Sequence, residues 1–213
     1  PLLTMSRGDL ANFHAAHCSP LNLVLSACGN VDPEALAAEV EKRFVRFPVA
    51  PPQPRMMAAV QIVPHYVKET LRKQCSQAFV VTGFPAVAIS DPLYPALRVA
   101  NAMLGEGMSA RLFRNLRDEQ SLAYSVGSSV EPHRLAGHLA LWIGTSPSQA
   151  ESARLSLLNE ARQMVTQATD EEFGRAKRYI TGKHLIARQS NQAKAHAIGA
   201  YEALGVGHGF DDY

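Results

Sequence analysis

The stretch "LGEGMSARLFRNLRDEQSLAYSVGSS", residues 104–129, contains the change of backbone pattern on which the fold depends. The glycines of "GEG" end one helix, and the spacing of apolar residues predicts a second helix over 110–118. The pattern then changes to that of a strand over 122–131. Arg117 therefore closes a helix, and Tyr124 follows seven residues later at the same helix–strand corner.

Capping residues, apolar periodicity and turn signals predict the other elements. Up to residue 84 they are helix 6–17, a buried strand over 20–29, helix 32–44, and strand candidates 58–67 and 75–84. After residue 84 they are a helix from Asp91 to about Leu104, strand 135–145, and a helical region from Ser148 to about Arg188. Within that last region a second helix begins at the Thr169/Glu172 capping box. In the last region Leu155, Leu158, Ala161 and Val165 lie on one face of the predicted helix. Helices over an antiparallel-looking sheet make this an α+β fold.

Composition and charge exclude several classes of protein. Hydrophobic residues make up 46% of the 213 residues, which is enough for a packed core. The net charge of +2 comes without a clustered basic face, which argues against a nucleic-acid-binding surface. No apolar run is long enough for a membrane span. Cys18, Cys28 and Cys75 show no spacing typical of a disulfide framework or a zinc knuckle, and we expect small buried thiols.

A proline-rich segment marks the domain boundary. "PVAPPQP", residues 48–54, holds four prolines, so it is neither helix nor central strand and is typical of a semi-rigid spacer. We assign residues 48–57 to this linker, between a first segment, 1–47, and a second domain, 58–213.

Most of the motifs that suggest chemistry are better explained structurally. His14 and His17 share a helical face, but no acid lies between them and no third zinc ligand is near. "GEG" follows a helix and lacks the third glycine of a dinucleotide-binding loop. His133 and His138 flank a hairpin turn and are expected to be solvated. The chain contains no H-x-x-E-H or G-x-S-x-G motif, and we assign it no metal ligand and no catalytic residue.

Arg117 and Tyr124 admit two interpretations from the residues alone. An arginine near a helix C-terminus suits the helix dipole, and a tyrosine in a strand is ordinary. Alternatively, the two side chains project from one corner, where a guanidinium and a phenol would supply directed hydrogen-bond donors. Such donors can hold a substrate carbonyl and stabilise the oxyanion that develops on it.

The order of the motifs resembles a known family. "GEGMSARLFRNLRDEQSLAYSV" is similar to the second-domain signature of the pitrilysin and insulinase-type zinc metallopeptidases, the M16 family. "DLANFHAAHCSPLNLVLSACGNVDPEALAAEVEKRF" resembles the end of the family's first domain, and "GFPAVAISDPLYPALRVANAMLG" resembles the entry to its second domain. The resemblance covers most of the chain and implies the LuxS/metalloprotease-like fold.

The resemblance also implies a role for the corner at 117–124. Arg117 and Tyr124 fall on the family's Arg/Tyr pair, which binds the peptide and stabilises the tetrahedral intermediate. Zinc and the general base would belong to the H-x-x-E-H domain, in the same chain or in a partner subunit. This chain would then be the substrate-binding, non-metal-binding half of a zinc-dependent endopeptidase and would be inactive alone.

Two departures from the family lead us to expect a fragment. The zinc motif would precede residue 1, and the last helix–strand unit of the second domain is not present. Apolar faces that meet those missing parts should be exposed, or paired in a homodimer of the fragment. Two alternatives remain. One is a catalytically inactive M16-like scaffold subunit, and the other is a free-standing peptide-binding module.

Overall fold

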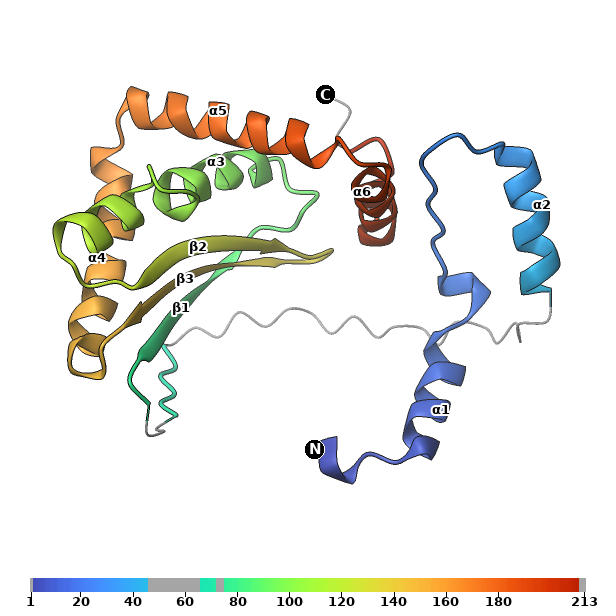
Figure 1. Cartoon of the computed structure of the whole chain (residues 1–213), viewed down its shortest axis with the longest axis horizontal. Coiled ribbons are helices and arrows are strands. Elements are labelled where there is room, and N and C mark those ends of the chain that lie inside the picture. Colours follow the sequence, from blue (N-terminus) through green and yellow to red (C-terminus); the bar gives the residue numbers. More distant parts are fainter. Residues whose placement is uncertain (1, 46–65, 72–74, 211–213) are drawn as a thin grey trace. The chain divides into compact units, whose positions relative to one another are not determined.

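The computed structural model describes residues 2–45, 66–71 and 75–210 (Figure 1). The chain forms two compact units. Residues 1–59 and 188–213 form the first unit, and residues 60–187 form the second. The predicted linker, 48–57, and most of the predicted strand 58–67 lie outside the described residues.

A three-stranded antiparallel sheet is the centre of the second unit. Its strands are β1 (Ala78–Ala86), β2 (Ser125–Pro132) and β3 (Gly137–Thr145), in the spatial order β1-β3-β2. The register aligns Val80, Ile143 and Val126 across the three strands, so these apolar side chains share one face. The strands predicted over 75–84, 122–131 and 135–145 are confirmed, with shifts at their ends.

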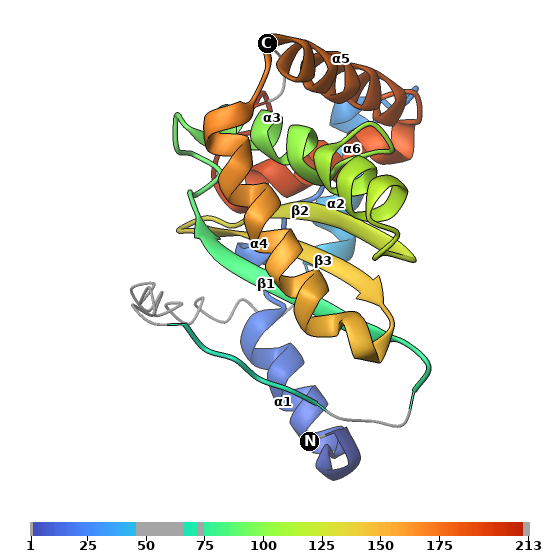
Figure 2. The same cartoon turned by 90° about the vertical axis from the view of Figure 1, so that its left-hand side faces the viewer.

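Helices cover that face of the sheet. They are α3 (Tyr94–Gly105), the short η3 (Phe113–Glu119), η4 (Pro147–Gln149), α4 (Ala150–Gln167) and α5 (Asp170–Ala187). α3 packs on β2, and α4 crosses β1 and β3 (Figure 2). α5 packs on α3 as an outer layer. The predicted α+β class, with helices over an antiparallel sheet, is confirmed.

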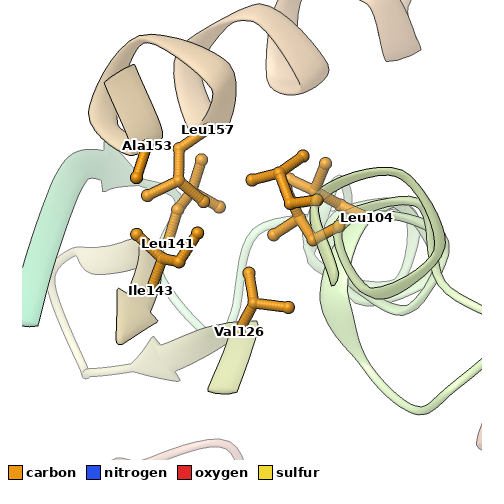
Figure 3. Close-up of a cluster of buried hydrophobic side chains, with 8 residues drawn as sticks. Leu104, Val126, Leu141, Ile143, Ala153 and Leu157 are labelled. Atoms are coloured by element: carbon orange, nitrogen blue, oxygen red, sulfur yellow. The ribbon is translucent and has the colours of Figure 1, made fainter. Parts of the chain in front are cut away.

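The core lies between the sheet and α4, η3 and α3. The structure buries Leu104, Leu112, Leu116, Val126, Leu141, Ile143, Ala153 and Leu157 there (Figure 3). The core-facing side of α4 coincides only in part with the predicted apolar face: Ala161 packs against the core, but Leu155 and Val165 are exposed. Ala153 and Leu157 are fully buried instead. The sequence pattern allows both faces, and the helix turns toward the sheet the face on which small Ala153 permits close packing.

The opposite face of the sheet carries exposed apolar side chains. Phe79 and Val81 on β1 are 66% and 57% exposed, and no described helix of this unit covers them. The Phe79 ring stacks on Trp142 of β3, with centroids 5.9 Å apart. Gly144 is the register partner of both Phe79 and Ser125, so this aromatic pair lies at the end of the sheet where β2 begins.

The first unit contains three α-helices among its described residues. They are α1 (Arg7–His17), α2 (Pro33–Phe44) and α6 (Asn191–Leu204), with 3₁₀ turns η1 (Leu2–Thr4) and η2 (Pro20–Asn22). Ser6 and Asp9 form a capping box at α1, and the carboxylate of Asp32 accepts from two backbone N–H groups of α2. The predicted helices 6–17 and 32–44 are confirmed. α6 was not predicted as a separate helix.

The predicted buried strand over 20–29 is wrong. Residues 20–22 form the turn η2, and the residues after it form no ladder, with Leu23 and Leu25 half-exposed. A strand needs a backbone partner, and the described residues of this unit contain no other strand. The segment instead contacts α6, because the hydroxyl of Ser26 donates to the carbonyl of Ala195 at 2.7 Å. Residues 188–213 belong to the same compact unit as the N-terminal part, and the domain boundary at 48–57 stays a prediction.

The cysteines and the helices also bear on the sequence predictions. No disulfide joins Cys18, Cys28 and Cys75, but the expectation that they are buried was wrong, since Cys18 and Cys75 are exposed. No helix in the described ranges is both long and apolar enough to cross a membrane.

Candidate functional site

Arg117 lies on a short π-helix that leads into the sheet. Residues 111 and 112 are α-helical, and η3 continues them in the wider form. The N–H of Gln120 donates to the carbonyl of Asn115, five residues back, at 3.0 Å. The helix predicted over 110–118 is therefore present, but most of it has π-helical and not α-helical hydrogen bonds. Such turns are rare and occur frequently at functional sites.

Buried leucines decide which side of η3 faces outward. Leu112 and Leu116 are fully buried in the core, and Arg117 follows on the exposed side. Its guanidinium lies over the ring of Phe113, 4.6 Å from Cζ to the ring centroid. Within the described residues this side chain donates no hydrogen bond, so its N–H groups are available to a ligand.

Tyr124 precedes β2 and does not lie within it. Its backbone N–H donates to the carbonyl of Gly144 at 2.8 Å, so it continues the β2–β3 ladder by one residue. The side chain is 62% exposed and makes no hydrogen bond in the described part of the chain. The predicted strand thus begins three residues late, at Ser125, and the phenol remains accessible.

The turn from η3 to β2 places Arg117 and Tyr124 on one corner. Ser121 has a φ of 51°, and the N–H of Leu122 donates to the carbonyl of Leu116 at 2.9 Å. These features reverse the chain between the π-helix and the strand. The corner therefore carries one guanidinium and one phenol, both exposed, with no contact between the two side chains in the described structure.

Glycines bring α3 close to β2 beside this corner. A Cβ on Gly105 would lie 2.4 Å from the backbone nitrogen of Ser128, which no residue but glycine permits. Gly107 has a φ of 89°, a conformation that favours glycine. The helix break predicted at "GEG" is confirmed, and close packing at Gly105 and the left-handed backbone at Gly107 are its physical reasons.

A buried ion pair anchors the start of this helical segment. Nη2 of Arg111 donates to Oε2 of Glu172 at 2.7 Å and to the carbonyl of Gln167 at 2.6 Å. The same carboxylate oxygen accepts from the N–H of Thr169, at 3.0 Å, in the predicted capping box. Burial acts to raise the pKa of Glu172, but the bonds from Arg111 and Thr169 prevail and lower it. The α4–α5 turn is thereby tied to the segment that carries Arg117.

A second polar tie holds η3 to α4, and sequence reasoning missed it. Nδ2 of Asn115 donates to Oε2 of Glu160 at 2.7 Å, and Glu160 is only 4% exposed. One turn earlier on α4, the hydroxyl of Ser156 donates to Oε1 of Gln120 at 3.2 Å. The available signal was a glutamate three residues after Leu157 on the apolar face of a helix.

The histidines do not assemble a metal site. His14 and His17 are exposed on α1, and His133 and His138 are exposed at the β2–β3 hairpin with ring centroids 5.8 Å apart. Across residues 2–45, 66–71 and 75–210, no group of three or more His, Cys, Asp or Glu side chains could hold a metal ion. The described residues therefore do not fit a zinc ion.

Comparison with known proteins identifies the family. The profile described as "Peptidase M16 inactive domain" matches residues 4–180. The chain belongs to this family. An uncharacterized zinc protease of Streptomyces coelicolor is 29% identical over 203 residues, which cover 91% of this chain and 43% of that protein. The M16 resemblance inferred from the motifs is thus confirmed, and the chain is an inactive domain of a family whose relatives are named zinc proteases.

Solved structures share the M16 inactive-domain fold. A protease from Helicobacter pylori matches with a TM-score of 0.80 at 19% identity, covering 100% of this chain and 52% of that one. A chain of complex III2 from Candida albicans matches with a TM-score of 0.72 at 14% identity, covering 94% and 49%. The chain spans about half the length of the curated relatives it matches.

Proposed function

We propose that this M16 inactive domain is the substrate-binding, non-metal-binding half of a zinc-dependent endopeptidase. Arg117 and Tyr124 hold the peptide and stabilise the tetrahedral intermediate. The observation that carries the proposal is that both side chains are exposed beside one turn and make no hydrogen bond to any described residue. Donors that no protein group satisfies are available to a ligand.

The chemistry of the two side chains suits an anionic intermediate. The guanidinium of Arg117 is cationic and offers several N–H donors in one plane. The phenol of Tyr124 offers one directed O–H donor. Attack on a peptide carbonyl places negative charge on its oxygen, and donors directed at that oxygen lower the barrier. Zinc and the general base belong to a zinc-bearing M16 domain, in cis or in a partner subunit, so this chain alone is inactive.

The uncovered sheet face offers apolar contacts to the same peptide. Phe79, Val81 and Trp142 are exposed or half-exposed there, in the rows of the sheet next to Gly144. The carbonyl of Gly144 accepts the N–H of Tyr124, so these rows adjoin the proposed site. An extended peptide at this end of the sheet would combine polar contacts at the corner with burial of apolar side chains.

The test is peptide cleavage by the complete protein, with its zinc-bearing half in the same chain or added as the partner subunit. Turnover of a mixed peptide library is compared for the wild type, Arg117→Ala and Tyr124→Phe. Loss of one donor to the oxyanion should lower kcat about 100-fold, with no change in thermal stability. Both side chains are exposed, so folding does not depend on them.

Two matched variants control for the loss of an exposed side chain. Arg114→Ala removes an exposed arginine from the same π-helix. Tyr66→Phe removes a phenol that is 66% exposed, close to the 62% of Tyr124. Both controls should retain wild-type turnover. Unchanged activity in Arg117→Ala and Tyr124→Phe, or an inactive wild type with zinc present, would instead favour a scaffold subunit, the alternative suggested by the fold it shares with the complex III2 chain.

A further inference from the structure

We propose that Glu160 is a positioning residue, which holds η3 in its π-helical register and thereby directs Arg117. The inference rests on the function proposed above for Arg117. Glu160 lies on α4, and its hydrogen-bond partner Asn115 is 45 positions away in the sequence. In the described contacts Glu160 touches neither Arg117 nor Tyr124.

α4 holds both residues of the π-helical hydrogen bond. The backbone bond runs from the N–H of Gln120 to the carbonyl of Asn115. Glu160 accepts from the side chain of Asn115, and Ser156 donates to the side chain of Gln120. Ser156 and Glu160 are four residues apart and so lie on one face of the helix. The two side-chain bonds therefore bracket the backbone bond that closes the π-helix at its C-terminal end.

Apolar packing and the polar bonds fix different features of η3. Leu112 and Leu116 fix which side of η3 faces the core, but burial of apolar surface has no preferred hydrogen-bond direction. The 2.7 Å hydrogen bond from Asn115 to Glu160 is directional, because α4 holds the accepting carboxylate in place. The position of Asn115 along the helix axis is therefore set by Glu160.

Glu160 is buried without a charged partner among the described residues. Its partner in the described residues is a neutral amide, and no Lys, Arg or His among them lies within ion-pair distance. Carboxylates are rarely buried unless they are paired with a charge, because losing water costs free energy. A buried polar residue that departs from this pattern is a candidate for a functional role.

Loss of the bond would let η3 adopt the α-helical pattern. In that pattern the N–H of Gln120 bonds to the carbonyl of Leu116, which at present accepts from Leu122. The two patterns compete for one carbonyl. In the α form each later residue rotates about the helix axis, so Arg117 changes direction relative to Tyr124, whose N–H stays on Gly144.

The experiment measures kcat and KM of the complete protein, with its zinc-bearing half present, on the peptide substrate of the preceding test. Glu160→Leu removes the acceptor, and Glu160→Gln keeps an amide oxygen that can accept from Asn115. Each is made with Arg117 intact and in the Arg117→Ala background. Asn115→Ala removes the donor of the same bond and replaces Glu160→Leu should that variant fail to fold.

With Arg117 intact, Glu160→Leu should lower kcat at least about tenfold with little change in KM, because a displaced donor mainly affects the transition state. Glu160→Gln should retain wild-type kcat. In the Arg117→Ala background Glu160→Leu should cause no further loss, because Glu160 acts through Arg117.

The outcomes separate this inference from the function on which it rests. Unchanged turnover in Arg117→Ala alone overturns both. Reduced turnover in Arg117→Ala, combined with full activity in Glu160→Leu, overturns only the role of Glu160. Additive losses from Glu160→Leu and Arg117→Ala would also overturn only the role of Glu160. So would a Glu160→Gln variant with a kcat as low as that of Glu160→Leu.

Discussion

Replacing Gly105 with alanine is expected to force α3 away from β2. The new Cβ would lie 2.4 Å from the backbone nitrogen of Ser128 and 2.8 Å from the carbonyl carbon of Gly127. Both atoms belong to the backbone of β2, so neither can rotate away as a side chain would. The contact is relieved only when the last turn of the helix moves relative to the strand.

The size of that movement sets the expected loss of stability. An ordinary carbon–nitrogen contact lies near 3.4 Å, so the helix end must shift by about 1 Å. Leu104, which is 1% exposed, moves with it and loses core contacts. Overpacking of this kind costs about 1–3 kcal/mol, and the higher helix propensity of alanine returns less than about 1 kcal/mol. The free energy of unfolding should therefore fall by about 1–2 kcal/mol.

Urea unfolding of the 213-residue chain, followed by circular dichroism, measures this loss. Gly182→Ala is the matched control, because Gly182 lies inside α5 and its Cβ would meet nothing within 4 Å. That variant should gain about 0.5–1 kcal/mol. A Gly105→Ala chain that unfolds at the wild-type urea concentration or above would refute the close approach of α3 to β2.

Two further predictions concern acid stability and self-association. The folded-state pKa of Glu172 lies below its ordinary 4.5, so its ion pair with Arg111 stabilises the fold above that pH and is lost as pH falls below it. On acidification, thermal unfolding should show a larger loss for wild type than for Glu172→Gln, and equal losses would contradict this. The exposed Leu10, Phe13 and Leu25 predict that the isolated chain forms a homodimer, and a strictly monomeric chain in sedimentation velocity would count against it.

Short-range signals predicted most of the elements correctly. The capping box at Ser6, the Asp32–Pro33 helix start and the Thr169 box each involve residues within three positions, so their hydrogen bonds form without help from the rest of the chain. The alternation of buried and exposed residues along β1 and β3 is likewise a short-range pattern. Arg117 and Tyr124 were found through the order of motifs, and their role stays a prediction; the structure shows that both side chains are exposed.

Long-range choices account for the errors. The apolar segment at 23–25 has the composition of a strand, but composition cannot supply the neighbouring strand that a ladder needs. The burial of Ala153 and Leu157, and the exposure of Leu155, depended on how α4 meets the sheet. Several faces of that helix had enough apolar residues, and only the packing partner distinguishes them.

The same division applies to the candidate site. Local residue order was enough to place a guanidinium and a phenol at a helix–strand corner and to give the chain its family. The π-helical register was not accessible in this way, because its side-chain bonds join residues far apart in the chain. Asn115 and Glu160 are 45 positions apart, and Arg111 and Glu172 are 61 apart. Such partners meet only after the chain has folded, and the direction in which Arg117 points is therefore a property of the tertiary structure.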